Sequence, residues 1–286
     1  MGALAGTERG GVNRRPHPWG LEVGVAVVAL LYLLPLVFLG LISLKPKAEI
    51  LRFDRILPVE WTWENYHRLF SNAEVIPIWA WLANSFFISL FTTLLVVSVS
   101  ALAAYAISRL RPDWGKGFLV VLAAAMMLPG QVLLVPMYLI LNWLGWLDSP
   151  RALVIPAAAG AFGVFLLTRF FRSLPDDLEA AAEIDGCGPW GKFVHVALPH
   201  ARSALVALGI ITFIGTWNDF LGPLVFLDSI RKYTLPVGLA LFQSSYANDY
   251  GLLFAASVVS SLPLLVVFAF FQAQIVRGIS FTGMKE

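Results

Sequence analysis

The string Gly186-Cys187-Gly188-Pro189-Trp190-Gly191-Lys192-Phe193 comes close to a nucleotide-binding motif. It matches a phosphate-binding loop except that Phe193 stands where a Ser or Thr would bind magnesium. Such a loop also needs a preceding strand and a run of free backbone N–H donors. Here an alanine-rich helical pattern precedes the glycines, and Pro189 has no N–H to donate. We therefore expect no nucleotide site in this chain.

Other reactive side chains do not form a recognisable catalytic or metal-binding set. The four histidines, His17, His67, His195 and His200, do not gather at the spacing of metal ligands, and Cys187 is the single cysteine. No Ser-His-Asp set and no pair of carboxylates converges on one place. The sequence predicts that the chain is not an enzyme and that it holds no metal and no cofactor.

Asp219 is the only ionisable residue deep within an apolar segment, and it follows Asn218. A charge in such a setting is costly and is therefore a candidate functional group. Two interpretations remain open. Either Asn218 and Asp219 line a path through the membrane, or the helix ends early and Asp219 caps it near the interface.

Gln131 is a further candidate for the same path. It belongs to the sequence Pro129-Gly130-Gln131, which interrupts another apolar segment near its centre. At such a break, freed carbonyl groups and the Gln131 amide can face a water-filled cavity. A simple packing kink is the other interpretation.

The composition places these residues in a membrane. The chain has 286 residues, of which 58% are hydrophobic and only 13% are charged. Charges are absent from 23–44, 75–108, 117–147, 152–168, 203–218 and 250–276, and several of these windows exceed the roughly 20 residues that cross a bilayer. The net charge of +2 is too small, and the cations too scattered, to indicate a nucleic-acid partner.

Six apolar segments predict an all-α integral membrane protein with six spans. Helices are required because every backbone N–H and C=O in hydrocarbon must be satisfied within the segment, and the runs are too long for barrel strands. The predicted spans are 21–43, 82–107, 118–141, 152–168, 204–227 and 252–275.

An even number of spans puts both termini on one side, and the distribution of Lys and Arg mildly favours the cytoplasm. The first apolar run is too long for a cleavable signal and lacks a cleavage site. We therefore divide the chain into a cytoplasmic tail (1–20), a first transmembrane helix (21–43), an extracytoplasmic loop (44–81), a core of five spans (82–276) and a cytoplasmic tail (277–286).

The polar excursion 169–203 has the pattern of two short helices joined by a turn. Pro175 and two aspartates suit the first turn of a helix, Gly186 permits the turn, and Pro189 suits the start of a second helix. Ala180, Ala181 and Ile184 give the first helix a shallow apolar face, which suits insertion into a groove on another protein. A solvated amphipathic loop is the alternative.

Three sets of residues resemble a known family. The first is Glu179-Ala180-Ala181-Ala182, Ile184-Asp185-Gly186 and Leu198-Pro199, and it resembles the EAA loop of permease subunits of binding-protein-dependent ABC importers. The other two sets resemble the carbohydrate branch of that family, the maltose-permease-like second subunit. They are Trp217 to Leu224 with Tyr233 to Leu239, and Gly278 to Lys285. The resemblance covers roughly 77–285.

The resemblance implies the partners and a coupling role. In that family the EAA loop docks in a cleft of a cytoplasmic ATPase, so Ala181, Ala182 and Ile184 would be the packed face and Gly186 the turn. The family glutamate stands six positions before the glycine, where this chain has Ala180, with Glu179 one residue earlier. The implied partners are a second permease, two ATPases that hold ATP and magnesium, an extracytoplasmic binding protein and membrane lipid.

The resemblance also implies import of a sugar or related polyol across the cell inner membrane. The polar and aromatic residues Gln243, Ser244, Tyr246 and Asn248 suit contact with a sugar or with a docked binding protein, and the resemblance favours the binding protein. A proton-coupled secondary transporter that uses Asp219 is the alternative function, and a membrane scaffold without transport is a further one.

Overall fold

The computed structural model describes residues 19–50, 55–71, 76–245 and 249–283, and these residues form helices and no strand. The all-α prediction is thereby confirmed. In chain order the elements are α1 (Trp19–Ser43), α2 (Glu64–Ser71), α3 (Ile78–Tyr105), the π-helical η1 (Ala106–Leu110), α4 (Gly115–Met126), the 3-10 helix η2 (Gly130–Leu133), α5 (Leu134–Trp143), α6 (Arg151–Ala157), α7 (Ala161–Ser173), α8 (Asp176–Ile184), α9 (Pro189–Lys192), the π-helical η3 (Phe193–Ala197), α10 (Leu198–His200), α11 (Arg202–Trp217), α12 (Leu221–Phe226), the 3-10 helix η4 (Ile230–Lys232), α13 (Leu235–Ser245) and α14 (Tyr250–Gly283).

Four stretches of the described chain are long and apolar enough to cross a bilayer as they stand: Glu22–Ser43, Ile78–Leu110, Arg151–Ser173 and Tyr250–Gln272. Two further pairs of helical segments are long and apolar enough only when the two members are taken together, and each pair is bent. The bend is 94° between Gly115–Met126 and Gly130–Trp143, and 74° between Pro189–His200 and Arg202–Trp217. The described chain therefore has up to six spans if each bent pair counts as one.

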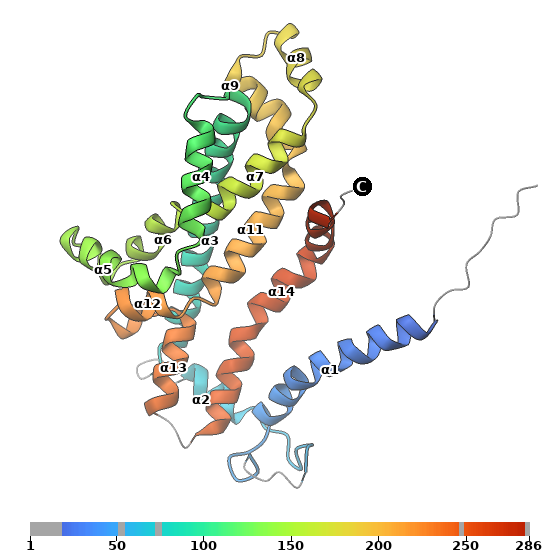
Figure 1. The fold of residues 1–286 in the computed structure, drawn as a ribbon. Coiled ribbons are helices and arrows are strands. Elements are labelled where there is room, and N and C mark those ends of the chain that lie inside the picture. Colours follow the sequence, from blue (N-terminus) through green and yellow to red (C-terminus); the bar gives the residue numbers. More distant parts are fainter. Residues whose placement is uncertain (1–18, 51–54, 72–75, 246–248, 284–286) are drawn as a thin grey trace, which may run out of the picture.

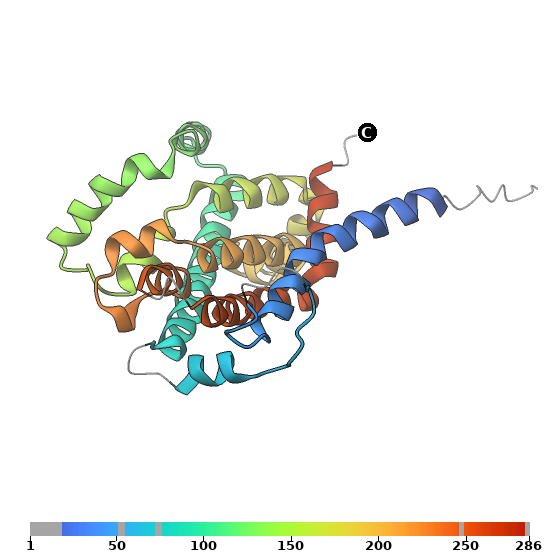
Figure 2. The same cartoon turned by 90° about the horizontal axis from the view of Figure 1, so that it is seen from below.

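Helix α3 is the centre of the bundle. It packs against α6, α7, α11 and α13, while α14 packs against α1, α2, α11 and α13. Helices α8 and α9 lie at one end of the bundle, and α2 and α13 lie at the other (Figure 1). Helices α1 and α5 project from opposite sides (Figures 1 and 2). Many of their apolar side chains are exposed, as expected for surfaces that face lipid or another subunit.

Two hydrophobic clusters hold the ends of the bundle. One gathers around Trp81, Trp217 and Leu235, near α13. The other gathers around Leu167, Phe171 and Phe193, where α7 meets η3. Each cluster joins segments that are far apart in the sequence, so burial of these side chains fixes how the spans pack.

Glycine allows the closest approach between helices. A methyl group at Gly238 in α13 would overlap the indole ring of Trp81 in α3. The Trp81 indole nitrogen also donates a hydrogen bond of 2.7 Å to the carbonyl of Ile230. Small residues at such crossings are typical of membrane helix packing, because backbones can then approach closely.

Three predicted spans are not continuous helices. The segment 152–168 is broken between Ala157, where α6 ends, and Ala161, where α7 begins. The segment 118–141 was expected to be interrupted at Pro129, and the chain indeed bends there, with Pro129 in an extended conformation. The segment 204–227 was predicted as one helix, but α11 ends at Trp217 and α12 begins only at Leu221. The Asn218 side chain folds back onto the carbonyl of Ile214 (2.9 Å), which helps to end the helix.

The loop after α1 is tied to the bundle by polar contacts. The Asn65 amide donates to the carbonyls of Ser43 (2.8 Å) and Lys45 (2.9 Å). Arg68 in α2 forms an ion pair of 2.6 Å with Asp249, directly before α14. Although burial alone raises the pKa of Asp249, the hydrogen bond and the charge of Arg68 outweigh it and hold that pKa below its ordinary value.

The glycine at 238 gives the first prediction. We expect Gly238→Ala to lower the free energy of unfolding by roughly 1–3 kcal/mol, because the added methyl forces Trp81 to move in a packed cluster. The measurement is the thermal unfolding midpoint of the detergent-solubilised chain. Gly209→Ala in α11 is the control, since its new methyl would lie 3.6 Å from Thr93 in ordinary contact. Equal midpoints for the two variants would contradict the packing argument.

Candidate functional site

Residues 174–201 form a projection that extends the bundle beyond the ends of α7 and α11 (Figure 1). Helix α8 follows Pro175, and its first turn carries Asp176, Asp177 and Glu179, which suit the positive end of the helix dipole. Gly186 then adopts a φ of +84°, a left-handed conformation that glycine takes without strain. Helix α9 begins with Pro189 at its first position.

The turn of the projection is closed by its own hydrogen bonds. The Gly186 amide donates to the carbonyl of Glu183 (3.0 Å), and the Cys187 amide donates to that of Ala182 (2.8 Å). Lys192 in α9 reaches back to the Glu183 carboxylate at 2.6 Å. This hydrogen bond and the charge of Lys192 lower the pKa of Glu183.

Arg109 joins the projection to the central helix. It lies in η1, which continues α3, and its side chain is only 3% exposed. Its guanidinium donates to the Asp176 carboxylate (2.5 Å) and to the carbonyl of Leu174 (2.6 Å). Its Nε also lies 3.3 Å from the Glu179 carboxylate, an ion-pair contact without hydrogen-bond geometry. The base of α8 is therefore fixed to the end of α3 by a buried cation.

The structure divides the predicted coupling residues between an inner and an outer face. Ala182 is buried within the chain itself and Glu179 is turned toward Arg109. The outer face carries Ile184, which is 88% exposed, and Trp190, which is 67% exposed. Of the other predicted residues, Ala180, Ala181, Asp185, Gly186 and Pro199 are exposed, and Leu198 is half-buried.

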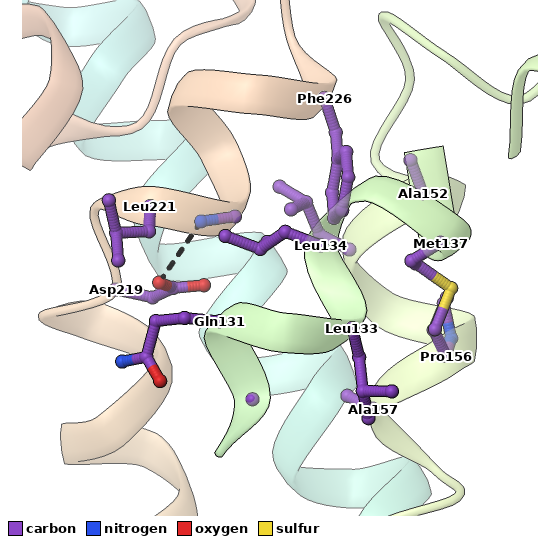
Figure 3. Close-up of a pocket in the computed structure, with 13 residues that line it drawn as sticks. Gln131, Leu133, Leu134, Met137, Ala152, Pro156, Ala157, Asp219, Leu221 and Phe226 are labelled. Atoms are coloured by element: carbon purple, nitrogen blue, oxygen red, sulfur yellow. Dashed lines mark hydrogen bonds between the residues drawn. The ribbon is translucent and has the colours of Figure 1, made fainter. Parts of the chain in front are cut away.

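A pocket of about 430 Å³ lies at the other candidate site, where three helical segments are broken (Figure 3). We call it the broken-helix pocket. It is lined by Gly130, Gln131, Leu133, Leu134, Met137, Ala152, Leu153, Pro156, Ala157, Asp219, Leu221, Gly222 and Phe226. These residues flank the break between α4 and η2, the break between α6 and α7, and the break between α11 and α12.

Gln131 and Asp219 come together in this pocket. They are its polar side chains, and the rest of its wall is formed by apolar side chains and glycines (Figure 3). Asp219 also accepts a hydrogen bond from the Gly222 amide at 3.4 Å, so it both caps the start of α12 and faces the pocket. Asn218 is not among the lining residues, and its amide is used within its own helix.

Asp148 does not line the pocket but is hydrogen-bonded to Phe226, which does. Its backbone amide donates to the carbonyl of Phe226 (2.8 Å), and its carboxylate accepts from the Ser229 hydroxyl (2.6 Å) and from Lys232 (2.8 Å). These hydrogen bonds, the one from Lys232 above all, hold the pKa of Asp148 well below its ordinary value. The loop before α6 is thereby tied to the loop after α12.

Sequence reasoning did not identify Arg109 or Asp148. Each is a single charged residue close to the end of an apolar segment, and its partners lie about 65 to 85 positions away, too far for any local pattern to show. Of the candidates for binding-protein contact, Gln243 is exposed on α13. The side chain of Ser244, and Tyr246 and Asn248 altogether, lie outside the described residues. Among the described residues, no three His, Cys, Asp or Glu side chains gather as a metal site.

The sequence matches a family model over residues 96–281, described as the binding-protein-dependent transport system inner membrane component. An arabinooligosaccharide transport system permease protein of Halalkalibacterium halodurans is 32% identical, over 96% of this chain and 100% of that protein. A trehalose/maltose transport system permease protein of Thermococcus litoralis is also 32% identical, over 93% and 96%.

Two further similarities agree with these. A sulfoquinovosyl glycerol transport system permease protein of Agrobacterium fabrum is 34% identical, over 88% of this chain and 89% of that protein. A chain in the crystal structure of a bacterial ABC transporter that imports the polysaccharide alginate superposes with a TM-score of 0.78 at 24% identity. The superposition covers 89% of this chain and 95% of that one, which shows that the fold is shared.

The Asp148 contact gives the second prediction. Asp148→Asn keeps the shape of the side chain and tolerates its positive φ of 53°, but it removes the charge that faces Lys232. We expect the thermal midpoint to fall by roughly 2–4 °C, a modest change because the pair is partly exposed. Asp228→Asn is the control, since the amide and carbonyl of Asp228 make its hydrogen bonds here and its side chain is exposed.

The same variant has a pH signature. Because the folded protein lowers the pKa of Asp148, its stabilisation is complete above the unfolded value near 4 and is lost as pH falls through the folded value. The difference between wild type and Asp148→Asn should therefore stay constant from about pH 8 to pH 5 and shrink below about pH 4. A difference that grows on acidification would refute this assignment.

Proposed function

Because the chain belongs to the family of binding-protein-dependent transport system inner membrane components, we propose that it is the permease subunit of an ATP-driven importer of a sugar or related polyol. The observation that carries the proposal is similarity over nearly the whole chain to several sugar-transport permeases. The relatives named for arabinooligosaccharides, for trehalose and maltose, and for sulfoquinovosyl glycerol differ in substrate, but each substrate contains a carbohydrate.

We place the broken-helix pocket on the translocation pathway. Irregular backbone at membrane depth is tolerated only where protein covers it or where it lines a water-filled cavity. Three such breaks meet here, together with the polar groups of Gln131 and Asp219. A carboxylate and an amide can accept hydrogen bonds from sugar hydroxyls, and the apolar remainder suits the faces of sugar rings. Asn218 is assigned a role in ending α11 instead.

We propose that a second permease completes the pathway. Helices α1 and α5 project from the bundle (Figure 2). Their exposed apolar side chains would pack against another membrane subunit. An extracytoplasmic binding protein would deliver the substrate at the end that carries α2 and α13, where Gln243 is exposed. Both termini and the projection would then lie in the cytoplasm.

We propose that the projection docks in a cleft of a separate ATPase, which binds ATP and magnesium. Ile184 in α8 and Trp190 in α9 are large apolar side chains that the projection exposes, and such anchors are typical of docking sites. Motion of the ATPase would reach the spans through Arg109, because this buried cation fixes the base of α8 to the end of α3. Glu179 acts in this scheme as an internal partner of Arg109, and the chain itself performs no hydrolysis.

Docking of the projection is tested with Ile184→Asp. Because Ile184 makes little contact within the chain, its replacement should leave folding intact but weaken binding of the ATPase by about fivefold to thirtyfold. The measurement is the affinity of the purified permease for the ATPase, together with the thermal midpoint of the permease. Ile56→Asp is the matched control, since Ile56 is 63% exposed outside the projection. Unchanged ATPase binding by Ile184→Asp would count against docking at this surface.

The energy source is tested in proteoliposomes that contain the assembled transporter. We expect uptake of the labelled sugar to require ATP on the side of the projection and to persist when an ionophore abolishes the proton gradient. Transport that continues without ATP and stops with the ionophore would instead support a proton-coupled transporter that uses Asp219. Asp219→Asn separates the two further, since a proton carrier cannot lose this carboxyl group and still couple to protons.

A further inference from the structure

A second pocket, of about 560 Å³, lies between the end of η1, the start of α4 and the end of α7. We call it the basic pocket. Its wall contains the cations Arg109, Arg111, Lys116 and Arg172 and one carboxylate, Asp113. The projection uses Arg109 at its base, but nothing in the proposed transport mechanism uses Lys116 or Arg172. Arg111 lies in the turn after η1, Lys116 lies in α4 and Arg172 lies in α7, so their convergence depends on the tertiary fold.

The cations differ in how far they are already neutralised. The Arg109 side chain is buried, and it forms ion pairs with Asp176 and Glu179. Arg111 is 69% exposed and shares Asp176 at 3.2 Å. Within the part of the chain that the structure describes, neither Lys116 nor Arg172 has a carboxylate within ion-pair distance, and both are exposed. The pocket therefore has a surplus of positive charge that is free to bind an anion.

The ends of the candidate spans predict that the pocket lies at the depth of lipid headgroups. The span Ile78–Leu110 ends at it, the span Arg151–Ser173 ends at it, and α4 begins there. Trp114, directly before α4, is 61% exposed and packs edge-on against Phe118. An exposed Trp at the end of a span is typical of the membrane–water interface. The positive end of α4, a helix of 12 residues, adds to the attraction for an anion.

We propose that the basic pocket binds the phosphate of an anionic phospholipid headgroup, with Lys116 and Arg172 as the main cationic contacts and Arg111 at the edge. Basic pockets between membrane helices are a known form of headgroup recognition. Lipid is favoured over a soluble phosphate because the cations surround an opening at the bilayer surface, where the acyl chains can remain in hydrocarbon beside Phe118 and the exposed apolar face of α4. The site would stabilise the junction between α4, α7 and the base of the projection.

The test uses the full chain, purified with its partners in a zwitterionic detergent, and native mass spectrometry with added phosphatidylglycerol. The variant is Lys116→Gln with Arg172→Gln. We expect its affinity for phosphatidylglycerol to fall by roughly 25-fold, about fivefold for each cation removed, while retention of phosphatidylcholine is unchanged. Arg151→Gln with Arg231→Gln removes the same charge from exposed positions outside the pocket and should change the affinity less than twofold.

Two further arms make the result decisive. Lys116→Arg with Arg172→Lys keeps both charges and should retain at least half of the wild-type affinity, which separates loss of charge from loss of structure. Inorganic phosphate and glycerol 3-phosphate at millimolar concentration should displace little lipid. Equal binding of phosphatidylglycerol by wild type and by the neutral double variant would overturn the proposal. Full displacement by inorganic phosphate would overturn the assignment to lipid, because the site would then be one for a soluble anion.

Discussion

A peptide group in hydrocarbon has no water to bond with, and this constraint governs the whole structure. It makes every membrane segment helical and makes every interruption costly. The described chain nevertheless breaks three helical segments, after α4, after α6 and after α11, and all three breaks border one pocket. Concentrating irregular backbone at one place is the arrangement expected if that place is wet. Gln131 and Asp219, which lie next to two of these breaks, give the pocket its polar side chains.

The two ends of the bundle are held together by different kinds of contact. At one end, hydrogen bonds from Asn65, Trp81 and Asp148 tie the loops to one another, so the pocket wall near Phe226 is held in place. At the other end, a single buried guanidinium, that of Arg109, joins α8 to the central helix. In the proposed mechanism, this link would carry a displacement of the projection to α3. The family role of such a projection in docking to an ATPase fits this construction.

The position of Glu179 explains how this chain departs from the family pattern. With glutamate one residue earlier than usual, the carboxylate turns inward to Arg109, and Ala180 stands exposed in the usual place. The outer surface of α8 is then more apolar and carries the exposed Ile184, and the exposed Trp190 follows in α9. Ala182, which the family resemblance assigns to the docking face, is buried against the rest of the chain. In the proposed docking, the exposed neighbours of Ala182 would therefore make the contact with a partner.

The sequence by itself determined the all-α membrane fold, the positions of the apolar segments, the interruption at Pro129 and the family, because hydropathy, proline and a short motif are all local signals. Only the tertiary structure decided that the segment 204–227 breaks at Asn218, that Gln131 and Asp219 share a pocket while Asn218 does not line it, and that Glu179 faces Arg109. The shared pocket and the Glu179 contact join segments about 70 to 90 residues apart. Which spans pack together sets the free energy of these contacts, and no local pattern of residues encodes that packing.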